Sequence, residues 1–266
     1  MKLEGKCVVV TGAAGGIGAA LARRFATEGA RAVVVSDRDA DGIDKVAHGI
    51  AGESSSEALA VPCDVTQESQ LLALVDTTEA RLGPIDLFCS NAGVISLGGA
   101  DASDDDWQLS LGVNLMAHVY AARILVPRML ERGGGYLLQT ASAAGLLTQL
   151  GSAPYSVTKH AALALAEWLA ITYGDQGLKV SVLAPQAVRT AMTAGVVDGG
   201  VAGVDGMLEP DAVADAVVAG LDAESFLILP HPRVLEYFQR KASDYERWLN
   251  GMRRLQTQFG GAGTPT

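Results

Sequence analysis

Tyr155 stands four residues before Lys159 in the segment SAPYSVTKHAAL, where a helix is expected to begin. Residues at that spacing share one face of a helix. The phenol of a free tyrosine has a pKa of about 10, which makes it a poor base at neutral pH. A lysine ammonium one helical turn away favours the phenolate, so the pair could transfer a proton. The same pair is also typical of a solvated surface contact, and the rest of the chain must decide between the two interpretations.

A second candidate site is the glycine-rich segment VVVTGAAGGIGAALARRF, which places Gly12, Gly16 and Gly18 between an apolar run and a helical pattern. Glycine permits a tight turn and the close approach of a phosphate. A helix N-terminus adds unpaired N–H groups and a partial positive charge. The position directly after a first strand predicts a dinucleotide pyrophosphate site, although the spacing differs from the common G-x-G-x-x-G pattern.

The elements that must position these residues are short apolar runs alternating with longer helical patterns. The expected strands are 6–11, 31–36, 57–62, 85–90, 135–141, 179–185 and 226–230. The expected helices are 16–29, 39–50, 67–82, 104–132, 154–174 and 210–220. Such alternation is typical of a parallel sheet covered on both faces, with right-handed crossovers. We predict an α/β fold, a single-domain Rossmann-type doubly wound parallel sheet of about seven strands with helices on both faces.

Composition limits the classes of partner and compartment. The 266 residues are 49% hydrophobic and 19% charged, which suits one domain, placed here at 1–258. The net charge of −10 and the lack of a Lys/Arg run argue against a nucleic-acid partner. We expect a cytoplasmic protein, because we find no leader pattern and no apolar run of membrane-spanning length. Cys7, Cys63 and Cys89 lack the paired spacing of a zinc site, so we expect buried free thiols and no metal.

Two segments fall outside the strand–helix alternation. Residues 193–208 are Gly-rich and apolar, which favours a lid over a ligand, with an ordinary flexible loop as the alternative. Residues 231–258 are expected to form a helical C-terminal extension, and the two hypotheses for it are that it covers the substrate mouth or that it packs on a neighbouring subunit. Its expected buried positions are Leu235, Phe238, Tyr245, Trp248, Leu249 and Met252. The tail 259–266 is expected to be disordered.

Taken together, these motifs resemble those of the short-chain dehydrogenase/reductase family, in its compact single-domain branch. The resemblance covers residues 3 to about 230, with every motif in family order. The positions that it assigns to cofactor binding are Gly12, Gly15, Gly16, Ile17 and Gly18 in the glycine loop, Asp64 and Val65 on the adenine side, Asn91, Ala92 and Gly93, and Tyr155 with Lys159. It implies a nicotinamide cofactor and the Rossmann-type fold already predicted.

The resemblance also implies a catalytic set of Asn114, Ser142, Tyr155 and Lys159. Tyr155 would be the general acid/base, and Lys159 would in addition bind the nicotinamide ribose. Ser142 would hold the substrate oxygen and stabilise developing charge. Asn114 would bend its helix and hold a water on a proton path from the lysine to solvent. The alternative for Asn114 is a satisfied core amide.

One stretch departs from the family pattern. After the sixth strand the family usually has Pro-Gly and then a threonine that anchors the nicotinamide carboxamide. Here Pro185, Val188 and Thr190 keep the expected cofactor-binding spacing, but Gln186 replaces the glycine. A non-glycine residue restricts the backbone, and its side chain could touch the substrate or the cofactor.

Asp37, at the end of the second strand, favours NAD as the cofactor. A carboxylate there can accept hydrogen bonds from both adenosine ribose hydroxyls and repels a 2′-phosphate. Ala13 and Ala14 occupy the positions where members that prefer the phosphorylated cofactor tend to carry a basic residue. Arg38 is the contrary signal, because its side chain could reach a 2′-phosphate or stack on adenine.

These observations predict an NAD(H)-dependent oxidoreductase that interconverts a hydrophobic secondary alcohol and its ketone. The predicted substrate contacts are Val94, Leu146, Gln149, Gln186 and Met192, mostly apolar. Leu146 and its neighbours Leu147 and Leu150 could equally be core residues. The alternatives are an NADP-linked carbonyl reductase and a catalytically silent NAD-binding sensor. The resemblance further implies a homodimer or homotetramer formed through helices 104–132 and 154–174.

Overall fold

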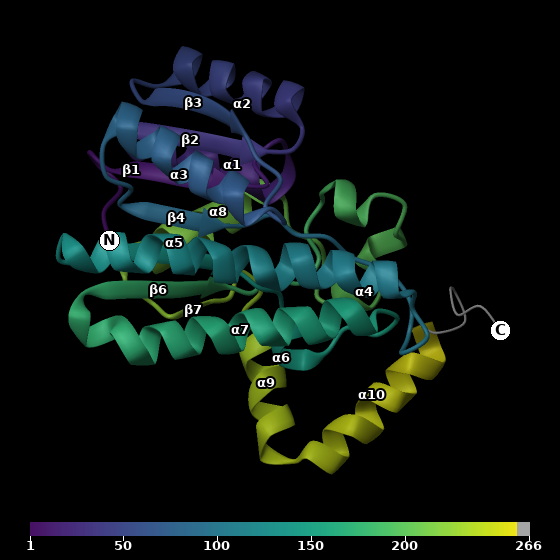
Figure 1. Cartoon of the computed structure of the whole chain (residues 1–266). Coiled ribbons are helices and arrows are strands. Elements are labelled where there is room, and N and C mark those ends of the chain that lie inside the picture. Colours follow the sequence, from purple (N-terminus) through teal and green to yellow (C-terminus); the bar gives the residue numbers. More distant parts are fainter. Residues whose placement is uncertain (260–266) are drawn as a thin grey trace.

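A parallel sheet lies at the centre of the computed structural model, which describes residues 1–259 (Figure 1). Its seven strands follow the order β3-β2-β1-β4-β5-β6-β7 and all pair in parallel. The strands are β1 Cys7–Thr11, β2 Ala32–Asp37, β3 Glu57–Pro62, β4 Leu87–Ser90, β5 Gly135–Thr140, β6 Leu178–Leu183 and β7 Leu227–Ile228. The predicted fold class is confirmed.

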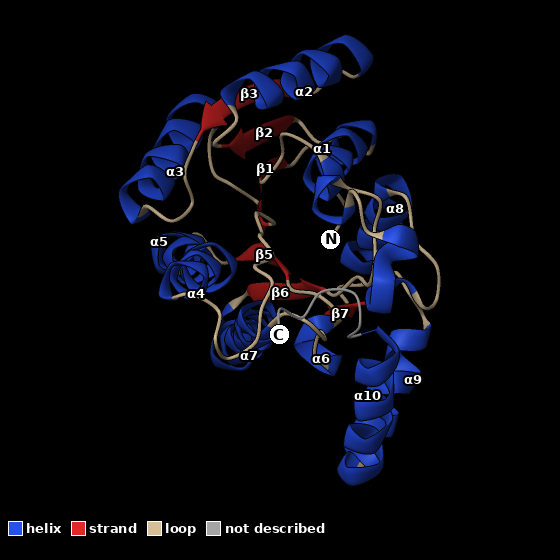
Figure 2. Ribbon diagram, turned by 90° about the vertical axis from the view of Figure 1, so that its right-hand side faces the viewer, coloured by secondary structure: helices blue, strands red, loops and turns tan. Residues whose placement is uncertain are grey.

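Helices cover both faces of the sheet, as Figure 2 shows in a view turned by 90°. One face packs against α1 Gly16–Thr27, α2 Ala40–Glu53 and α8 Pro210–Asp222. The other packs against α3 Glu68–Leu82, α5 Ala117–Glu131 and α7 Ala153–Tyr173. Because every central strand is buried on both sides, its sequence is apolar throughout instead of alternating.

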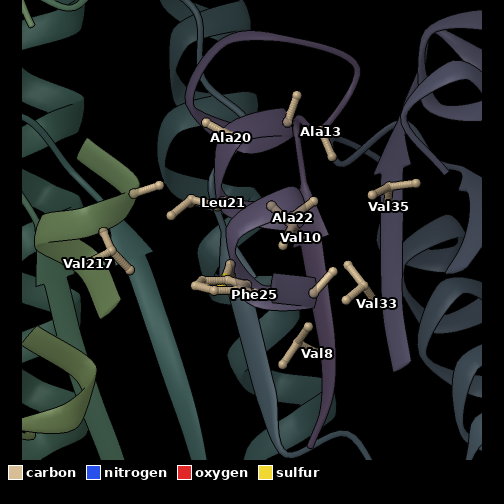
Figure 3. Close-up of a cluster of buried hydrophobic side chains, with 14 of the residues drawn as sticks. Val8, Val10, Ala13, Ala20, Leu21, Ala22, Phe25, Val33, Val35 and Val217 are labelled. Carbon is tan, nitrogen blue, oxygen red and sulfur yellow. The ribbon is translucent and has the colours of Figure 1, made fainter. Parts of the chain in front are cut away.

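The core beneath α1 illustrates this packing (Figure 3). Val8 and Val10 of β1 point to the same face and meet Leu21 and Phe25 of α1, all with no exposed surface. Fully burying side chains of this size is worth about 1.5–3 kcal/mol each. This core fixes α1 on the sheet, and the loop that precedes α1 is therefore held at the carboxyl end of β1.

The strand order reverses between β1 and β4, which are hydrogen-bonded neighbours. Crossovers leave these two strands in opposite directions, so the loops that follow them separate and leave a crevice at the carboxyl ends. The glycine loop follows β1, and the segment Asn91–Gly93 follows β4. The topology thus brings together two predicted cofactor segments from different parts of the chain.

The predicted helix 104–132 is composed of three parts. Helix α4, Asp104–Leu111, leads into a π-helical segment, Gly112–Met116, and then into α5. Within residues 1–259 the stretch Asp104–Glu131 is the one helix long and apolar enough to cross a membrane, and half of its most apolar window is buried inside the fold. Such burial is what a core helix of a globular protein shows, so length and composition are weak grounds for a span here.

The C-terminal extension is two helices, α9 Arg233–Ser243 and α10 Tyr245–Phe259, which project from the sheet as a V (Figure 1). Asp244 separates them, because its carboxylate accepts the N–H of Arg247 and caps α10. The expected buried positions were partly wrong. Leu235, Tyr245 and Leu249 are exposed, Phe238, Trp248 and Met252 are half-buried, and Val234 is fully buried. Phe259, placed in the predicted tail, ends α10, and residues 260–266 lie outside the described residues.

The predicted lid, residues 193–208, contains two short helical turns within Val197–Gly203, separated by a kink at Asp198, Gly199 and Gly200. The segment is tied to the loop after β6, because Ala187 donates its N–H to Ala202 and accepts one from Leu208. These two backbone hydrogen bonds hold the segment against the core. Its role as a lid remains a prediction.

The three cysteines are buried free thiols, as expected. Burial raises the pKa of Cys7 and of Cys63 to about 11 and raises the pKa of Cys89 further. Thiols with raised pKa values are poor nucleophiles, so we interpret these three cysteines as residues of the hydrophobic core.

Candidate active site

The start of α7 holds Tyr155 and Lys159 on one helix face. Ser152 caps the helix by accepting the N–H of Tyr155 at 3.3 Å, which fixes where the first turn begins. The Lys159 ammonium lies 5.7 Å from the centroid of the Tyr155 ring. Only 2% of Lys159 is exposed, and its Nζ donates to the Thr140 carbonyl at 2.8 Å. A lysine in such a position is no surface contact, so the solvated interpretation of this pair is wrong.

Asn114 lies in the π-helical segment and is fully buried. Its Oδ1 accepts the N–H of Val94 and its Nδ2 donates to the Val94 carbonyl, both at 2.9 Å, with a further bond to Thr158 at 3.2 Å. A Cβ built on Gly93 would lie 3.5 Å from both Asn114 Oδ1 and Lys159 Nζ. The hydrogen-bonding groups of the Asn114 amide are therefore all paired, and the amide also lies near Lys159. The two interpretations of Asn114, a paired core amide and a member of the catalytic group, are therefore compatible.

Ser142 follows β5 and adjoins Tyr155. Its hydroxyl donates to the Pro185 carbonyl at 3.3 Å and accepts the N–H of Ala144 at 3.1 Å. Ser142 also lies close enough to the Tyr155 side chain to act to lower the pKa of that phenol. The serine hydroxyl thus stands between the loop after β6 and the phenol of α7.

Burial is the largest influence on the pKa values of both Tyr155 and Lys159. Burial raises the pKa of Tyr155 above its ordinary value of 10, and the Ser142 hydroxyl only partly opposes this. Burial also lowers the pKa of Lys159 to about 8. Desolvation of the buried phenol sets the direction of this shift, and the lowering expected from the ammonium together with a positive nicotinamide ring stays a prediction.

The glycine loop is shaped by steric contact at two of its glycines. A Cβ on Gly12, where φ is +66°, would lie 2.7 Å from Ala92 Cα. A Cβ on Gly18 would lie 2.1 Å from the Gly12 carbonyl oxygen. By contrast, a Cβ on Gly15 would meet nothing within 4 Å. The loop therefore packs tightly against Ala92 at Gly12, closes on itself at Gly18 and opens outward at Gly15.

This opening fits a bound pyrophosphate. No side chain caps the start of α1, and its first turn carries no acidic residue. The N-terminal N–H groups of that helix are left for an anion. Gly16 faces Thr190, since a Cβ on Gly16 would lie 3.0 Å from the threonine Cγ2, so the glycine loop meets the loop after β6. The Asp37 carboxylate accepts the N–H of Ala14 at 3.3 Å and so stands beside the glycine loop.

Asn91 ties three strand ends together. Its Nδ2 donates to the Thr11 carbonyl at 3.0 Å, and its Oδ1 accepts the Thr140 hydroxyl at 3.2 Å. Thr11 in turn accepts the N–H groups of Asn91 and Ala92 through its Oγ1. These bonds set the distance between β1, β4 and β5 at the crevice, a structural task for Asn91 that the sequence pattern did not indicate.

The remaining predicted cofactor residues occupy varied environments. Arg38 is exposed, Val65 is buried, and Asp64 Oδ1 accepts the N–H and hydroxyl of Thr66. Pro185 and Val188 are buried in the loop after β6. Asp64 therefore shapes its own turn, and its contact with adenine stays a prediction.

The predicted substrate residues differ in burial and in the groups that they contact. Val94 is half-buried beside Asn114, and Gln149 exchanges backbone hydrogen bonds with the Ser156 hydroxyl at the start of α7. Met192 is 42% exposed. Leu146, in the short helix α6 Ala144–Leu147, is 3% exposed and belongs to an apolar cluster that includes Val234 of α9. The structure thus places Leu146 in the core, the alternative stated for the leucines.

His118, which was not among the predicted site residues, lies one helical turn after Asn114. It is fully buried, and its Nδ1 hydrogen-bonds Gln139, the neighbour of Thr140 on β5. Burial and the charge of Lys159 lower the pKa of His118 to about 4. A histidine on an otherwise apolar helix face was the available signal, together with the Gln139 that interrupts an apolar strand.

His118 predicts an acid-sensitive stability. The unfolded chain takes up its proton below the ordinary pKa of 6.5, whereas the folded chain does so only near 4. The free energy of unfolding should therefore fall between pH 6.5 and pH 4, by about 3 kcal/mol from this residue. Urea unfolding of the wild type and of His118→Gln across this range measures the effect. The exposed His48→Gln is the control, and parallel curves for wild type and His118→Gln would contradict the prediction.

Comparison with known proteins agrees with this geometry. The family model for the short chain dehydrogenases matches residues 6–199. The 1-deoxy-11-beta-hydroxypentalenate dehydrogenase of Streptomyces avermitilis is 39% identical over 232 residues, covering 86% of this chain and 85% of the relative. The 7alpha-hydroxysteroid dehydrogenase of Escherichia coli K12 is 34% identical over 190 residues, covering 71% and 74%.

A solved structure of a short chain dehydrogenase/reductase from Burkholderia phymatum in complex with NAD superposes with a TM-score of 0.84. It is 27% identical and covers 92% of this chain and 96% of its own. That structure was solved with NAD, and the two curated relatives are named as dehydrogenases. By its sequence, its sheet and the residues gathered at the end of that sheet, the chain belongs to the short-chain dehydrogenase family, oxidoreductases that act on CH–OH groups.

Proposed function

We propose that this protein is an NAD(H)-dependent dehydrogenase that interconverts a hydrophobic secondary alcohol and its ketone, with Tyr155 as the general acid/base. The convergence of Tyr155, Ser142 and the buried Lys159 carries the proposal. Asn114 closes the group from the neighbouring helix, beside Gly93.

Each side chain has a task in this reaction. In oxidation the phenolate oxygen of Tyr155 accepts the hydroxyl proton of the alcohol, and in reduction the phenol returns a proton to the carbonyl oxygen. The Ser142 hydroxyl donates to the same substrate oxygen and stabilises its developing charge. The Lys159 ammonium has three N–H donors, of which Thr140 uses one, leaving two for the cofactor ribose and the proton path. The nicotinamide, when bound, supplies the hydride chemistry.

The uncapped start of α1 and the opening at Gly15 would hold the pyrophosphate. Asp37 supports NAD over NADP, because its carboxylate stands beside the glycine loop where a 2′-phosphate would be repelled. Among structurally similar proteins, the 7 alpha-hydroxysteroid dehydrogenase was solved with NADH and L-sorbose reductase of Gluconobacter frateurii with NADPH. Both cofactors therefore occur on this fold, and Asp37 is the discriminating residue within this chain.

Replacing Asp37 should relax the choice of cofactor. Asp37→Ala removes the charge that opposes a 2′-phosphate, and we expect the ratio of kcat/KM for NAD⁺ over NADP⁺ to fall by about tenfold or more, ~1.4 kcal/mol. The measurement is the absorbance of reduced nicotinamide, with secondary alcohols that range from aryl carbinols to steroids and other polycyclic alcohols. Asp41→Ala, an exposed acid four residues further on, is the matched control.

The outcomes separate the alternatives. Turnover of bulky alcohols with NAD⁺ supports the proposal, whereas a wild-type preference for NADP⁺ favours the carbonyl-reductase alternative and contradicts the argument from Asp37. Cofactor binding without turnover of any alcohol or ketone would favour the silent sensor. The buried catalytic group favours an enzyme, because a sensor has no use for the Tyr155 hydroxyl.

We also propose that the protein is a homodimer or homotetramer through α4–α5 and α7. Large apolar side chains are exposed on these helices, with Leu109 at 44%, Val157 at 51%, Trp168 at 55% and Ile171 at 83%. Exposed apolar side chains gathered on neighbouring helices are typical of an interface. Light scattering at several protein concentrations tests the assembly. The cytoplasmic location stays a prediction.

A further inference from the structure

Lys241 of α9 is a buried cation that the roles proposed above do not use. Only 8% of the residue is exposed, although lysine is rarely buried without a partner. Its ammonium donates to the Leu146 carbonyl of α6 at 2.6 Å and to His160 Nε2 of α7 at 3.5 Å. It also lies 5.7 Å from the centroid of the Tyr245 ring, a cation–π contact. Lys241 thus joins the C-terminal extension to two helices of the candidate active site.

The contact with His160 has a defined direction. His160 Nδ1 lies 2.8 Å from the Ser156 carbonyl oxygen, which can only accept, so Nδ1 carries the ring proton. Burial and the charge of Lys241 lower the pKa of His160, which keeps the ring neutral at pH 7. Nε2 of the neutral ring is an acceptor, and it takes a hydrogen bond from the ammonium. His160 directly follows Lys159, so this bond connects α9 to the helix that carries Tyr155 and Lys159.

The other acceptor, Leu146, belongs to a helix of one turn that begins beside Ser142. The Ser142 hydroxyl accepts the N–H of Ala144 at 3.1 Å, and its carbonyl accepts the N–H of Gly145 at 2.8 Å. At the opposite end, Lys241 binds one of the carbonyls that a helix end leaves without an intrahelical partner. A helix of four residues is not stable by itself, so the contacts at its two ends determine where it lies.

Helix α6 lies directly on the backbone of α7. A Cβ built on Gly145 would lie 2.6 Å from the Lys159 carbonyl oxygen, closer than a methyl group tolerates. Helix α9 packs beside α6 (Figure 1), and its Lys241 binds both α6 and α7 near this close contact. A shift of α6 along α7 would therefore move Ser142 relative to Tyr155.

We propose that Lys241 is a positioning residue for Ser142. By fixing the C-terminal end of α6 against α7, it holds the Ser142 hydroxyl where that group can donate to the substrate oxygen. This inference rests on the proposed function, and it gives the C-terminal extension a part in the reaction. Lys241 touches neither substrate nor cofactor in this role, so its whole effect on the rate passes through the serine.

The test is a double-mutant cycle of Lys241→Met and Ser142→Ala, with kcat for oxidation of the best alcohol of the panel as the readout. We expect Ser142→Ala to lower kcat by about 10²-fold and Lys241→Met to lower it by about tenfold, because the serine is then displaced but not lost. In the Ser142→Ala background, Lys241→Met should lower kcat by less than about twofold, since the group through which it acts is already absent. NADH affinity should stay within about threefold of wild type throughout.

Arg240→Met is the matched control, because it removes the neighbouring cation, whose side chain is 65% exposed, and should leave kcat unchanged. Lys241→Gln keeps an N–H donor in the buried site and is carried through the same cycle, in case thermal unfolding shows that the methionine variant does not fold.

The outcomes separate the positioning role from the proposed function. A loss that recurs in full in the Ser142→Ala background is what a merely structural lysine would give, and it would overturn the positioning role alone. A wild-type kcat in both Lys241 variants would overturn it as well and leave the proposed function intact. A wild-type kcat in Ser142→Ala, or no turnover of any alcohol by the wild type, would overturn the proposed function and the positioning role together.

Discussion

Tyr155→Phe is expected to lower kcat for alcohol oxidation by about 10²–10⁴-fold, the range of a lost general acid/base. The substitution removes one oxygen atom and leaves the ring in place beside Lys159 and Ser142. Initial rates with NAD⁺ and the best alcohol of the panel measure the loss. The binding of NADH, followed by fluorescence, should be nearly unchanged, because the cofactor contacts proposed for Lys159 and the glycine loop remain.

Tyr173→Phe is the matched control, since Tyr173 lies at the far end of the same helix. A wild-type rate in Tyr155→Phe would exclude Tyr155 as the acid/base. The pH dependence gives a second measure. Because burial raises the pKa of Tyr155, oxidation, which needs the phenolate, should accelerate as the pH rises above neutral. Reduction, which needs the phenol, should persist at neutral pH and decline only at alkaline pH.

Gly18→Ala is expected to destabilise the fold and to abolish tight cofactor binding. The new methyl would lie 2.1 Å from the Gly12 carbonyl oxygen and 2.7 Å from Asn91 Nδ2. The glycine loop must move to admit it, at a cost of about 1–3 kcal/mol of unfolding free energy, as for other overpacked sites. Movement of the loop also displaces Asn91, whose side chain joins the ends of β1 and β5 through hydrogen bonds to Thr11 and Thr140. Urea unfolding and NADH titration measure the two effects.

Gly15→Ala separates cofactor binding from stability. Its φ of −169° suits any residue, and its methyl would meet nothing within 4 Å, so the unfolding free energy should stay within about 0.5 kcal/mol of wild type. If the pyrophosphate occupies the opening at Gly15, NADH affinity should nevertheless fall by about tenfold or more. Unchanged NADH affinity in Gly15→Ala would place the pyrophosphate elsewhere.

The sequence was a good guide wherever function is carried by neighbours in the chain. The i, i+4 spacing of Tyr155 and Lys159 and the glycines between β1 and α1 are local features, and helix and turn geometry alone predict their arrangement. The apolar strands likewise predicted the parallel sheet, because a strand buried on both faces has no polar alternation.

The C-terminal extension shows where local patterns failed. The prediction assumed one helix, but Asp244 breaks it, and the buried face of α9 runs through Val234, Phe238 and Lys241 instead of Leu235. Lys241 is buried because its ammonium donates to the Leu146 carbonyl of α6. Apolar side chains alone do not reveal a face that contains a buried, paired lysine.

By itself, then, the sequence determined the fold class, the family and the tyrosine–lysine pair that we propose as catalytic, since these follow from periodicity, spacing and short motifs. Only the tertiary structure decided which distant groups meet: Thr140 with Lys159, Thr190 with Gly16, His118 with Gln139, and His231 with Gln186. It also decided that burial raises the pKa of Tyr155. The physical reason is common to all of these, because strand order and burial are properties of the packed chain, and no short segment contains them.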